Sequence, residues 1–296
     1  MRAAVVKTFG GPEAVEIAEV AVPEPGAGQV RIKVAAGALN PVDLAVRAGL
    51  FGGTGGAVGL GWDVAGAVDA VGADAGLGVG DAVVGLVPGV TGPLGAHAEY
   101  VVVDADAVAA APASVDAVHA GTLPLNGLTA AQALDLLELP AGSSLLVTGA
   151  AGAVGGFAVQ LAAHRGIAVT GHARAADEEL VRSLGATSFT AGEVAPGSVD
   201  AVLDAAMLGE PALEWVRDGG AFVSARPGGE PAGVRGVRIT AVSVRPDGAR
   251  LAELAGLVDA GVLSLRVAET YPLAESAKAH ARLAEGGVRG RLVLVP

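Results

Sequence analysis

A glycine-rich stretch near the middle of the chain, Gly149 to Gly155, has the composition of a phosphate-binding turn. The apolar run before it, 145–148, is typical of a buried strand, and the run after it places apolar residues at helical spacing. Glycine permits a tight turn and close backbone approach, and the N–H groups at a helix N-terminus bind a pyrophosphate. The stretch therefore predicts a dinucleotide site. Its candidate contacts are Gly149, Ala150, Gly152, Ala153, Val154 and Gly155.

Composition alone could generate such a pattern, because 46 of the 296 residues are glycine. Composition does not explain the strand before the turn or the helix after it, so the binding interpretation is favoured.

The residues after the second apolar run indicate which dinucleotide would bind. In an NAD site a carboxylate at this point accepts the ribose hydroxyls. This chain instead has His172 and Arg174 there, and Arg174 could pair with a 2′-phosphate through a charge-assisted hydrogen bond. The pattern predicts NADPH, with His172 and Arg174 beside the adenosine ribose. In the alternative, Arg174 is solvated and Asp177 serves NAD.

The elements around this turn alternate between strands and helices. Continuous apolar runs are typical of parallel strands that helices cover on both faces. They occur at 145–148, 167–170, 201–203, 221–224 and 239–244. Segments 154–165 and 177–184 have helical length and spacing, and 249–260 is amphipathic. The middle of the chain is predicted to be a doubly wound α/β domain.

The first hundred residues have a different pattern, with short strands separated by glycine and proline. The predicted strands are 3–6, 30–35, 64–71, 82–86 and 98–103. Helical patterns begin after Pro112, at 115–125 and 129–137, and strands return at 266–270 and 291–295 around a helix at 274–285. We therefore expect an α/β protein with a mostly antiparallel β domain formed by 1–115 with 270–296, and a parallel-sheet domain formed by 116–269.

Composition excludes several classes of protein. A hydrophobic content of 52% is incompatible with intrinsic disorder. The net charge of −12 and the lack of a basic patch argue against nucleic acid or an anionic membrane surface as partner. With no cysteine there are no disulfides, thiolate nucleophiles or Cys-ligated zinc. Charges at Lys7 and Glu13 precede any secretory apolar region, so we expect a cytoplasmic protein.

The uncharged stretch 140–163 is long enough to span a bilayer. A strand, a turn and a buried helix explain it better, and no second comparable span exists in the sequence.

Further motifs run along nearly the whole chain. They are 36–43 (AGALNPVD), 61–66 (GWDVAG), 80–85 (GDAVVG), 98–101 (AEYV), 123–130 (LPLNGLTA) and 182–186 (RSLGA). Together with the glycine turn, these motifs resemble the medium-chain dehydrogenase/reductase superfamily, specifically its zinc-independent quinone oxidoreductase branch. The resemblance implies a GroES-like catalytic domain interrupted by a Rossmann domain, with the active cleft between them and a homodimeric assembly. It also implies NADPH-dependent hydride transfer to a quinone or a related conjugated carbonyl.

The resemblance also bears on metals. Zinc-dependent relatives use a Cys and a Gly-His-Glu segment where this chain has Asn40 and Gly61-Trp62-Asp63. The five histidines lie in separate elements without metal-ligand spacing, so no metal is predicted. A quinone or an enone needs no metal, because hydrogen-bond donors or water can stabilise the charge that develops on its conjugated oxygen.

By resemblance, Asn40 and Asp43 line the substrate side and Thr129 lies near the nicotinamide. Asn40 could donate an N–H to a substrate carbonyl. Each residue also has a structural interpretation: Asn40 precedes Pro41 as a turn pair, Asp43 could cap a helix at 43–48, and Thr129 could be a helix N-cap.

Phe51 stands where close relatives often carry a tyrosine whose hydroxyl serves the substrate. A phenyl ring can stack on a flat acceptor but provides no proton. The glycine-rich segment 52–56 beyond it could be a flap over the cleft or a plain linker. The predicted catalytic set is Asn40, Asp43, Phe51 and Thr129.

Two other functions use the same scaffold. One is an enoyl reductase that saturates a carbon–carbon double bond of a biosynthetic intermediate. The other is a non-catalytic NADP-binding protein like the lens crystallins of the family. The glycine turn argues for a bound dinucleotide in every case, and does not by itself establish turnover.

Overall fold

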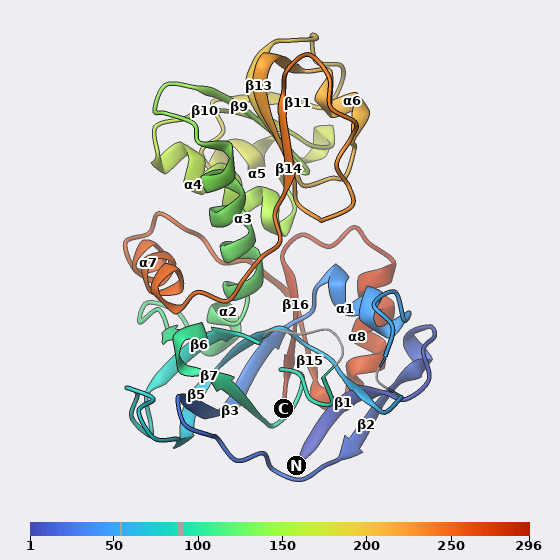
Figure 1. The fold of residues 1–296 in the computed structure, drawn as a ribbon, viewed down its shortest axis with the longest axis vertical. Helices are drawn as coiled ribbons and strands as arrows, with labels where there is room; N and C mark the ends of the chain where they lie inside the picture. Colours follow the sequence, from blue (N-terminus) through green and yellow to red (C-terminus); the bar gives the residue numbers. More distant parts are fainter. Residues whose placement is uncertain (54, 88–91) are drawn as a thin grey trace. The chain divides into compact units, whose positions relative to one another are not determined.

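In the computed structural model, residues 1–53, 55–87 and 92–296 are described. Their contacts divide the chain into two compact units (Figure 1). The first unit comprises Met1–Leu125, Arg245–Asp259 and Leu265–Pro296, and the second comprises Asn126–Val244 and Ala260–Ser264.

The first unit is built on a seven-stranded sheet in the order β15-β16-β3-β5-β6-β8, with β7 also paired to β3. Its strands are β3 (Gln29–Ala38), β5 (Asp63–Val71), β6 (Ala82–Leu86), β7 (Tyr100–Asp104), β8 (Val108–Ala110), β15 (Val267–Pro272) and β16 (Arg291–Val295). All pairs are antiparallel except β15 with β16. A three-stranded sheet adds β1 (Arg2–Val6), β2 (Val15–Glu19) and β4 (Val58–Gly59). Alternate residues of β3, Val30, Ile32 and Val34, point into the core, as the period of a strand requires.

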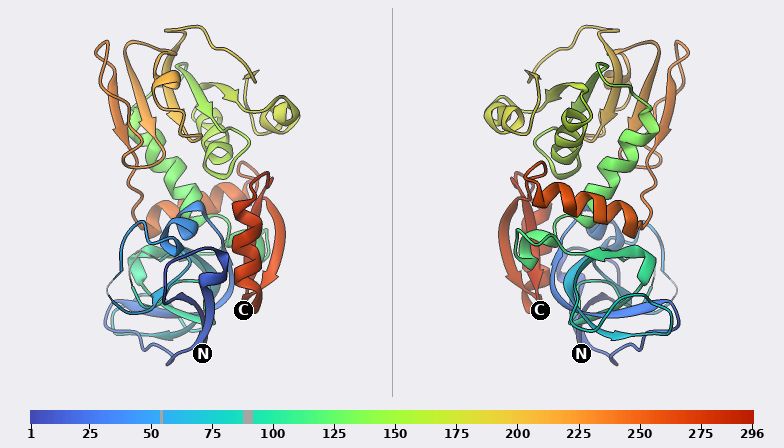
Figure 2. Two further views of the ribbon diagram at one scale, coloured as in Figure 1. Left: turned by 90° about the vertical axis from the view of Figure 1, so that its right-hand side faces the viewer. Right: turned by 90° about the vertical axis from the view of Figure 1, so that its left-hand side faces the viewer.

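Four helices and three 3-10 turns complete this unit. They are α1 (Pro41–Arg47), α2 (Ala117–Ala120), α7 (Gly248–Asp259), α8 (Ser276–Ala284), η1 (Pro12–Ala14), η2 (Ala105–Ala107) and η4 (Leu273–Glu275). Figure 2 shows α8 alongside β15 and β16, which it also contacts. Helix α2 packs on β3 and β5, and α7 packs on β8 and β6. Both helices therefore lie in the first unit, whereas the expected boundaries assigned them to the parallel-sheet domain.

The second unit contains a six-stranded parallel sheet in the order β11-β10-β9-β12-β13-β14. Its strands are β9 (Ser144–Thr148), β10 (Ala168–His172), β11 (Ser188–Thr190), β12 (Val199–Asp204), β13 (Val216–Ser224) and β14 (Arg238–Ala241). The helical segments are most of α3 (Pro124–Leu137), α4 (Ala153–His164), η3 (Ala175–Asp177), α5 (Glu178–Ser183) and α6 (Glu210–Leu213). Leu145, Leu203 and Phe222 are fully buried in the sheet, as expected for strands covered on both faces. The predicted fold class, an antiparallel β domain with a Rossmann domain, is confirmed.

Two sequence-based predictions about helices need correction. Helix α3 begins at Pro124, so Thr129 lies inside the helix and the N-cap interpretation is wrong. The helix expected at 115–125 is reduced to α2, because Gly121 ends that helix and Pro124 starts the next.

The uncharged stretch 140–163 forms β9, the glycine turn and most of α4. In the part of the chain that the structure describes, no helix is long and apolar enough to cross a membrane.

Candidate functional site

The glycine turn joins the end of β9 to the start of α4. Gly149 has φ +60°, a conformation that favours glycine. A Cβ built on Gly155 would lie 2.2 Å from the Gly149 carbonyl oxygen, so this helix position also requires glycine. Gly152 is the N-cap of α4 and supplies no side-chain cap. The first-turn N–H groups, including those of Ala153 and Val154, have no acceptor within the helix and are placed to receive a pyrophosphate.

The candidate ribose residues follow β10, the strand beside β9. His172 ends β10, and its ring lies 5.2 Å from that of Trp215 between centroids. Burial lowers the pKa of His172, although the nearby Asp204 opposes this effect. The Arg174 side chain is 67% exposed, and its Nε lies 3.6 Å from Oδ2 of the buried Asp177. A long contact of an exposed guanidinium is weak, so Arg174 can turn to a phosphate at little cost.

A second polar cluster lies in the first unit, where α1 begins. Asn40 is the N-cap of α1 and Asp43 is its third residue, and both are buried. Asp43 Oδ2 accepts from the Asn40 backbone N–H at 2.7 Å, and Oδ1 accepts from the Gly61 N–H at 3.0 Å. The expectation of a helix at 43–48 capped by Asp43 is corrected, because the helix begins at Pro41 with Asn40 as its N-cap. Asp43 instead holds the start of the helix and the segment before β5 from the third helical position. Burial raises the pKa of Asp43, against these hydrogen bonds and the nearby charges.

The Asn40 side chain is fully engaged within this cluster. Its Nδ2 donates to Asp63 Oδ2 at 2.7 Å and to the Ala38 carbonyl at 3.2 Å, and its Oδ1 accepts from Arg291. A substrate carbonyl would have to replace Asp63 or Ala38 as the acceptor of an Asn40 hydrogen. The expected donation to substrate therefore needs a rearrangement of this side chain.

Asp63 and Arg291 form the centre of the cluster. Asp63 is fully buried, and its Oδ1 accepts from the Leu125 N–H at 2.6 Å. Burial raises the pKa of Asp63 to about 6, and the hydrogen bonds and Arg291 oppose the shift. The buried Arg291 donates to the Leu39 carbonyl and to Asn40, and burial lowers its pKa. Sequence reasoning assigned these two residues no role, although each stands at the start of an apolar strand, and a charge next to such a run is an available signal.

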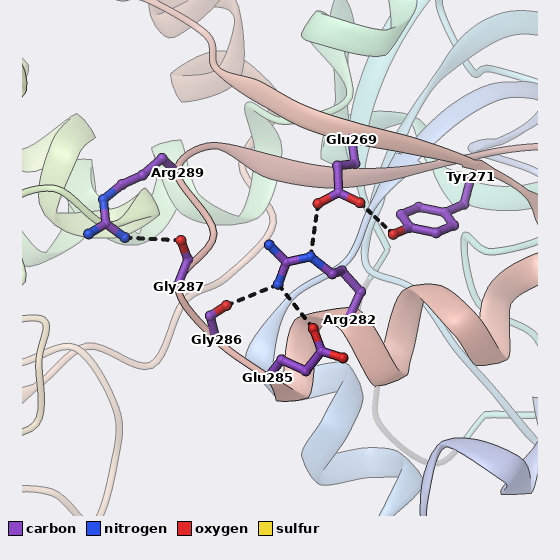
Figure 3. Close-up of polar contacts among 7 residues, drawn as sticks. All are labelled: Glu269, Tyr271, Arg282, Glu285, Gly286, Gly287 and Arg289. Atoms are coloured by element: carbon purple, nitrogen blue, oxygen red, sulfur yellow. Dashed lines mark hydrogen bonds and ion pairs between the residues drawn. The ribbon is translucent and has the colours of Figure 1, made fainter.

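The chain before Arg291 is held by a smaller network, shown in Figure 3. Arg282 Nε donates to Glu269 at 2.9 Å and the Tyr271 hydroxyl donates to the same carboxylate at 2.5 Å. Arg282 also donates to the Gly286 carbonyl at 3.0 Å. These bonds join α8 to β15 and to the loop that leads from α8 to β16, the strand that begins with Arg291.

Two histidines and an arginine lie close to this cluster. His97 Nε2 donates to the Ala38 carbonyl at 3.1 Å, and its ring meets that of His280 edge-on, 6.4 Å between centroids. Several buried nitrogen atoms here have no hydrogen-bond partner within the described residues. They are Nδ1 of His97, both ring nitrogens of His280, and Nε and Nη1 of Arg47. Burial lowers the pKa of His280 to about 3, with help from the charges of His97 and Arg47. His280 is therefore neutral at physiological pH.

The remaining predicted residues, Phe51 and Thr129, lie in different units. Phe51 follows α1 in the first unit and is 48% exposed, beside Leu50, which is 75% exposed. The ring of Phe9 lies against Gly49 and Gly53 and adds to this apolar surface. Thr129 is buried in α3 in the second unit. The glycine-rich segment after Phe51 includes Thr54, which lies outside the described residues.

The polar cluster does not fit a zinc ion. The carboxylates of Asp43 and Asp63 already accept hydrogen bonds from backbone N–H groups, and Asp63 accepts another from the Asn40 side chain. The positive charge of Arg291 also stabilises the Asp63 carboxylate. Across the described ranges, no group of three or more His, Cys, Asp or Glu side chains could hold a metal. The glycine turn, in contrast, fits a dinucleotide, because its two constrained glycines carry no side chain and lead directly into the first turn of α4, where backbone N–H groups favour a phosphate.

Comparison with known proteins shows what the chain is similar to. Residues 26–113 match the alcohol dehydrogenase GroES-like domain, and residues 174–294 match a family described as zinc-binding dehydrogenase. The chain is 34% identical to a chloroplastic NADPH-dependent alkenal/one oxidoreductase of Arabidopsis thaliana, over 100% of the chain and 80% of that protein. It is 32% identical to a quinone oxidoreductase of Pseudomonas aeruginosa, over 97% of each. A polyketide synthase system protein of Streptomyces orinoci is 34% identical over 90% of the chain and 13% of that protein.

Solved structures agree with these relatives. The quinone oxidoreductase of Coxiella burnetii has a TM-score of 0.85 at 27% identity, covering 100% of this chain and 99% of that one. A mycobacterial protein solved in complex with NADPH has a TM-score of 0.85 at 26% identity, covering 100% of both chains.

Proposed function

Since the chain belongs to the medium-chain dehydrogenase/reductase superfamily, in the group that includes quinone oxidoreductases and alkenal reductases, we propose that it is an NADPH-dependent oxidoreductase acting without zinc. It transfers a hydride to a quinone or a related conjugated carbonyl. The observation that carries this proposal is the glycine turn, whose geometry requires glycine at Gly149 and Gly155 and joins the end of β9 directly to the N-terminus of α4.

The residues of the second unit bind and orient the cofactor. When bound, a nicotinamide cofactor supplies the hydride, so the chain itself must supply binding, orientation and stabilisation of charge. Ala153 and Val154, in the first turn of α4, hold the pyrophosphate through backbone N–H groups, and Gly152, whose own N–H donates to the Gly149 carbonyl at 2.8 Å, lets the phosphate approach the backbone closely. Arg174 pairs with the 2′-phosphate, which favours NADPH over NADH, and His172 lies at the same end of β10.

The residues of the first unit fit an acceptor that needs no Lewis acid. Asn40, Asp43 and Asp63 are held by internal hydrogen bonds, and Phe51 offers an exposed ring for stacking. Reduction of a quinone to a hydroquinone takes one hydride and one proton. Because Phe51 has no hydroxyl, the proton comes from water or another donor.

Parallel titrations test the cofactor assignment. Purified protein is titrated with NADPH and with NADH, following binding, and then oxidation when 1,4-benzoquinone is added. Tight NADPH binding, weak NADH binding and quinone-dependent turnover are expected. Arg174→Ala should remove most of the preference for NADPH, whereas Arg182→Ala, which removes another exposed arginine in the last turn of α5, should keep it. If neither cofactor binds, the proposal is wrong.

A second candidate, an enoyl reductase, is favoured by the similarity to a polyketide synthase system protein. Product analysis separates the two activities: a quinone reductase forms hydroquinone, whereas an enoyl reductase saturates the double bond of an α,β-unsaturated thioester. A protein that binds NADPH and is inert to both classes of acceptor would be a non-catalytic, crystallin-like member of the family.

The assembly follows by analogy with the family. A homodimer is proposed, and light scattering of the purified chain tests it. A cytoplasmic location is also proposed, since a chain without cysteine suits a reducing compartment, and fractionation of the source cells tests it.

A further inference from the structure

A buried hydrogen bond joins two strand ends of the parallel sheet in the second unit. Thr148 is the last residue of β9 and Asp204 is the last residue of β12, and the two are partners in the strand register. Both are fully buried. Thr148 Oγ1 donates to Asp204 Oδ1 at 2.5 Å.

The same pair holds the loop 205–209 that follows β12. The Ala206 N–H donates to Thr148 Oγ1 at 2.9 Å, the Leu208 N–H donates to Asp204 Oδ1 at 3.1 Å, and the Gly209 N–H donates to Asp204 Oδ2 at 2.8 Å. Within this loop Met207 has φ +60°, which is uncommon for a residue with a side chain. The three bonds therefore stabilise a loop conformation that the sequence of the loop does not favour by itself.

This loop touches the glycine turn. A Cβ built on Gly149 would lie 3.3 Å from both the nitrogen and the Cβ of Ala206. Strands β10 and β11 lie on one side of β9, and β12, β13 and β14 lie on the other, so the strand order reverses between β9 and β12. In doubly wound sheets a dinucleotide crosses the carboxyl edge at that point. The adenosine half then lies toward β10, and the other half lies toward loop 205–209.

We propose that Thr148 and Asp204 are positioning residues for the nicotinamide half of the cofactor, acting through loop 205–209. The inference rests on the proposed function and extends it, because it assigns the two halves of the dinucleotide to separate supports. Thr148 and Asp204 are not catalytic residues, since both side chains are buried and their bonds are to the loop and to each other. Donors converge on both oxygens of the Asp204 carboxylate, so its charge is compensated locally.

The test uses Thr148→Val and Thr148→Ser. Valine has the shape of threonine and suits a strand, but it removes both the acceptor for Ala206 and the donor to Asp204. Serine keeps the hydroxyl and is the matched control. Each full-length variant is titrated with NADPH and with adenosine 2′,5′-bisphosphate, which carries only the adenosine half. KM for NADPH, KM for 1,4-benzoquinone and Tm are measured in parallel.

Thr148→Val should bind NADPH about tenfold more weakly, the effect of losing the one hydrogen bond that ties the loop directly to Thr148, from the Ala206 N–H, with unchanged affinity for the bisphosphate. KM for NADPH should rise while KM for benzoquinone stays constant, and Thr148→Ser should resemble the original protein in every measurement. Asp204→Asn, which cannot accept at both oxygens, should repeat the Thr148→Val pattern.

Two outcomes would overturn the assignment. If Tm falls but NADPH affinity does not, the pair is only structural. If NADPH and the bisphosphate weaken equally, the pair supports the whole site and not one half. Failure of the proposed function would be seen separately, in the unsubstituted protein, as failure to bind either probe or to reduce benzoquinone.

Discussion

Replacing Asp63 by asparagine should change how the stability of the first unit depends on pH. The pKa of Asp63 is about 6 in the folded protein and 3.8 in the unfolded chain. Between these values the unfolded chain has released a proton that the folded protein keeps, so stability falls as pH rises. Each pH unit between the two pKa values is worth up to about 1.4 kcal/mol, which gives about 2 kcal/mol lost between pH 4 and pH 6.

His280 acts in the opposite direction over the same range. Its pKa is about 3 in the folded protein and 6.5 in the unfolded chain. Between these values the unfolded chain binds a proton that the folded protein does not, so stability rises with pH by about 1.4 kcal/mol per unit. In the unsubstituted protein the pH-dependent contributions of Asp63 and His280 to stability should nearly cancel between pH 4 and pH 6. A variant that removes one of the two groups leaves the pH dependence of the other to be measured.

The assay is urea unfolding at several pH values, followed by the fluorescence of Trp62, which lies in the first unit, in a Trp215→Phe background. Relative to the parent, the free energy of unfolding of Asp63→Asn should rise by about 2 kcal/mol from pH 4 to pH 6, and that of His280→Leu should fall by about the same amount. Asp63→Asn should also lower the free energy of unfolding by about 1–3 kcal/mol at every pH. Leu125 and Asn40 donate to the two oxygens of Asp63, and the NH₂ group of asparagine cannot accept one of these hydrogen bonds. If the Asp63→Asn difference is flat with pH, the reasoning about its burial is wrong.

Three other substitutions test the site and its support. Gly155→Ala should abolish measurable NADPH binding, because its Cβ would meet the Gly149 carbonyl at 2.2 Å; a titration that matches the parent would contradict this. Arg291→Met should lower the free energy of unfolding in urea by about 3–5 kcal/mol, because the buried Asp63 carboxylate loses its compensating charge, and Arg291→Lys should lower it less. Equal stability of the two variants would show that the charge is unimportant. Tyr271→Phe removes one partly exposed hydrogen bond and should cost about 1 kcal/mol or less, so a larger loss by the same assay would contradict the peripheral role of this network.

Strand and helix positions followed closely from the sequence where the local signal was strong. The strands at 82–86 and 291–295 have the bounds that their apolar runs predicted, and helix 154–165 is displaced by one residue. The short strands β2, β4, β8 and β11 were missed. β2 is largely exposed and the other three have only two or three residues, so none has a pronounced apolar pattern. These strands form because they pair with other strands, and a local hydrophobic pattern cannot predict pairing with a strand distant in the sequence.

The two parts of the candidate site differ in the same way. The glycine turn is local, so its residues, its strand and its helix could all be predicted from one short stretch. The polar cluster is not local, because Asn40, Asp63 and Arg291 meet only when β3, β5 and β16 are placed together. The Thr148 and Asp204 pair likewise depends on strands β9 and β12 lying side by side. Sequence motifs marked some of these positions, but not the hydrogen bonds between them.

The polar cluster also bears on which acceptors the protein can reduce. Asn40 and Asp63 occupy the segments in which zinc-dependent relatives of the family carry ligands, and here the two side chains bind each other. Arg291 adds a cation beside them, and its bond to the Asn40 oxygen fixes the orientation of the amide. A metal entering this cluster would have to displace these bonds and lie against a guanidinium, which is electrostatically unfavourable. An unactivated carbonyl gains most from a Lewis acid, whereas a conjugated acceptor delocalises the developing charge. The composition of the cluster therefore favours quinones and enones over simple aldehydes and ketones as substrates.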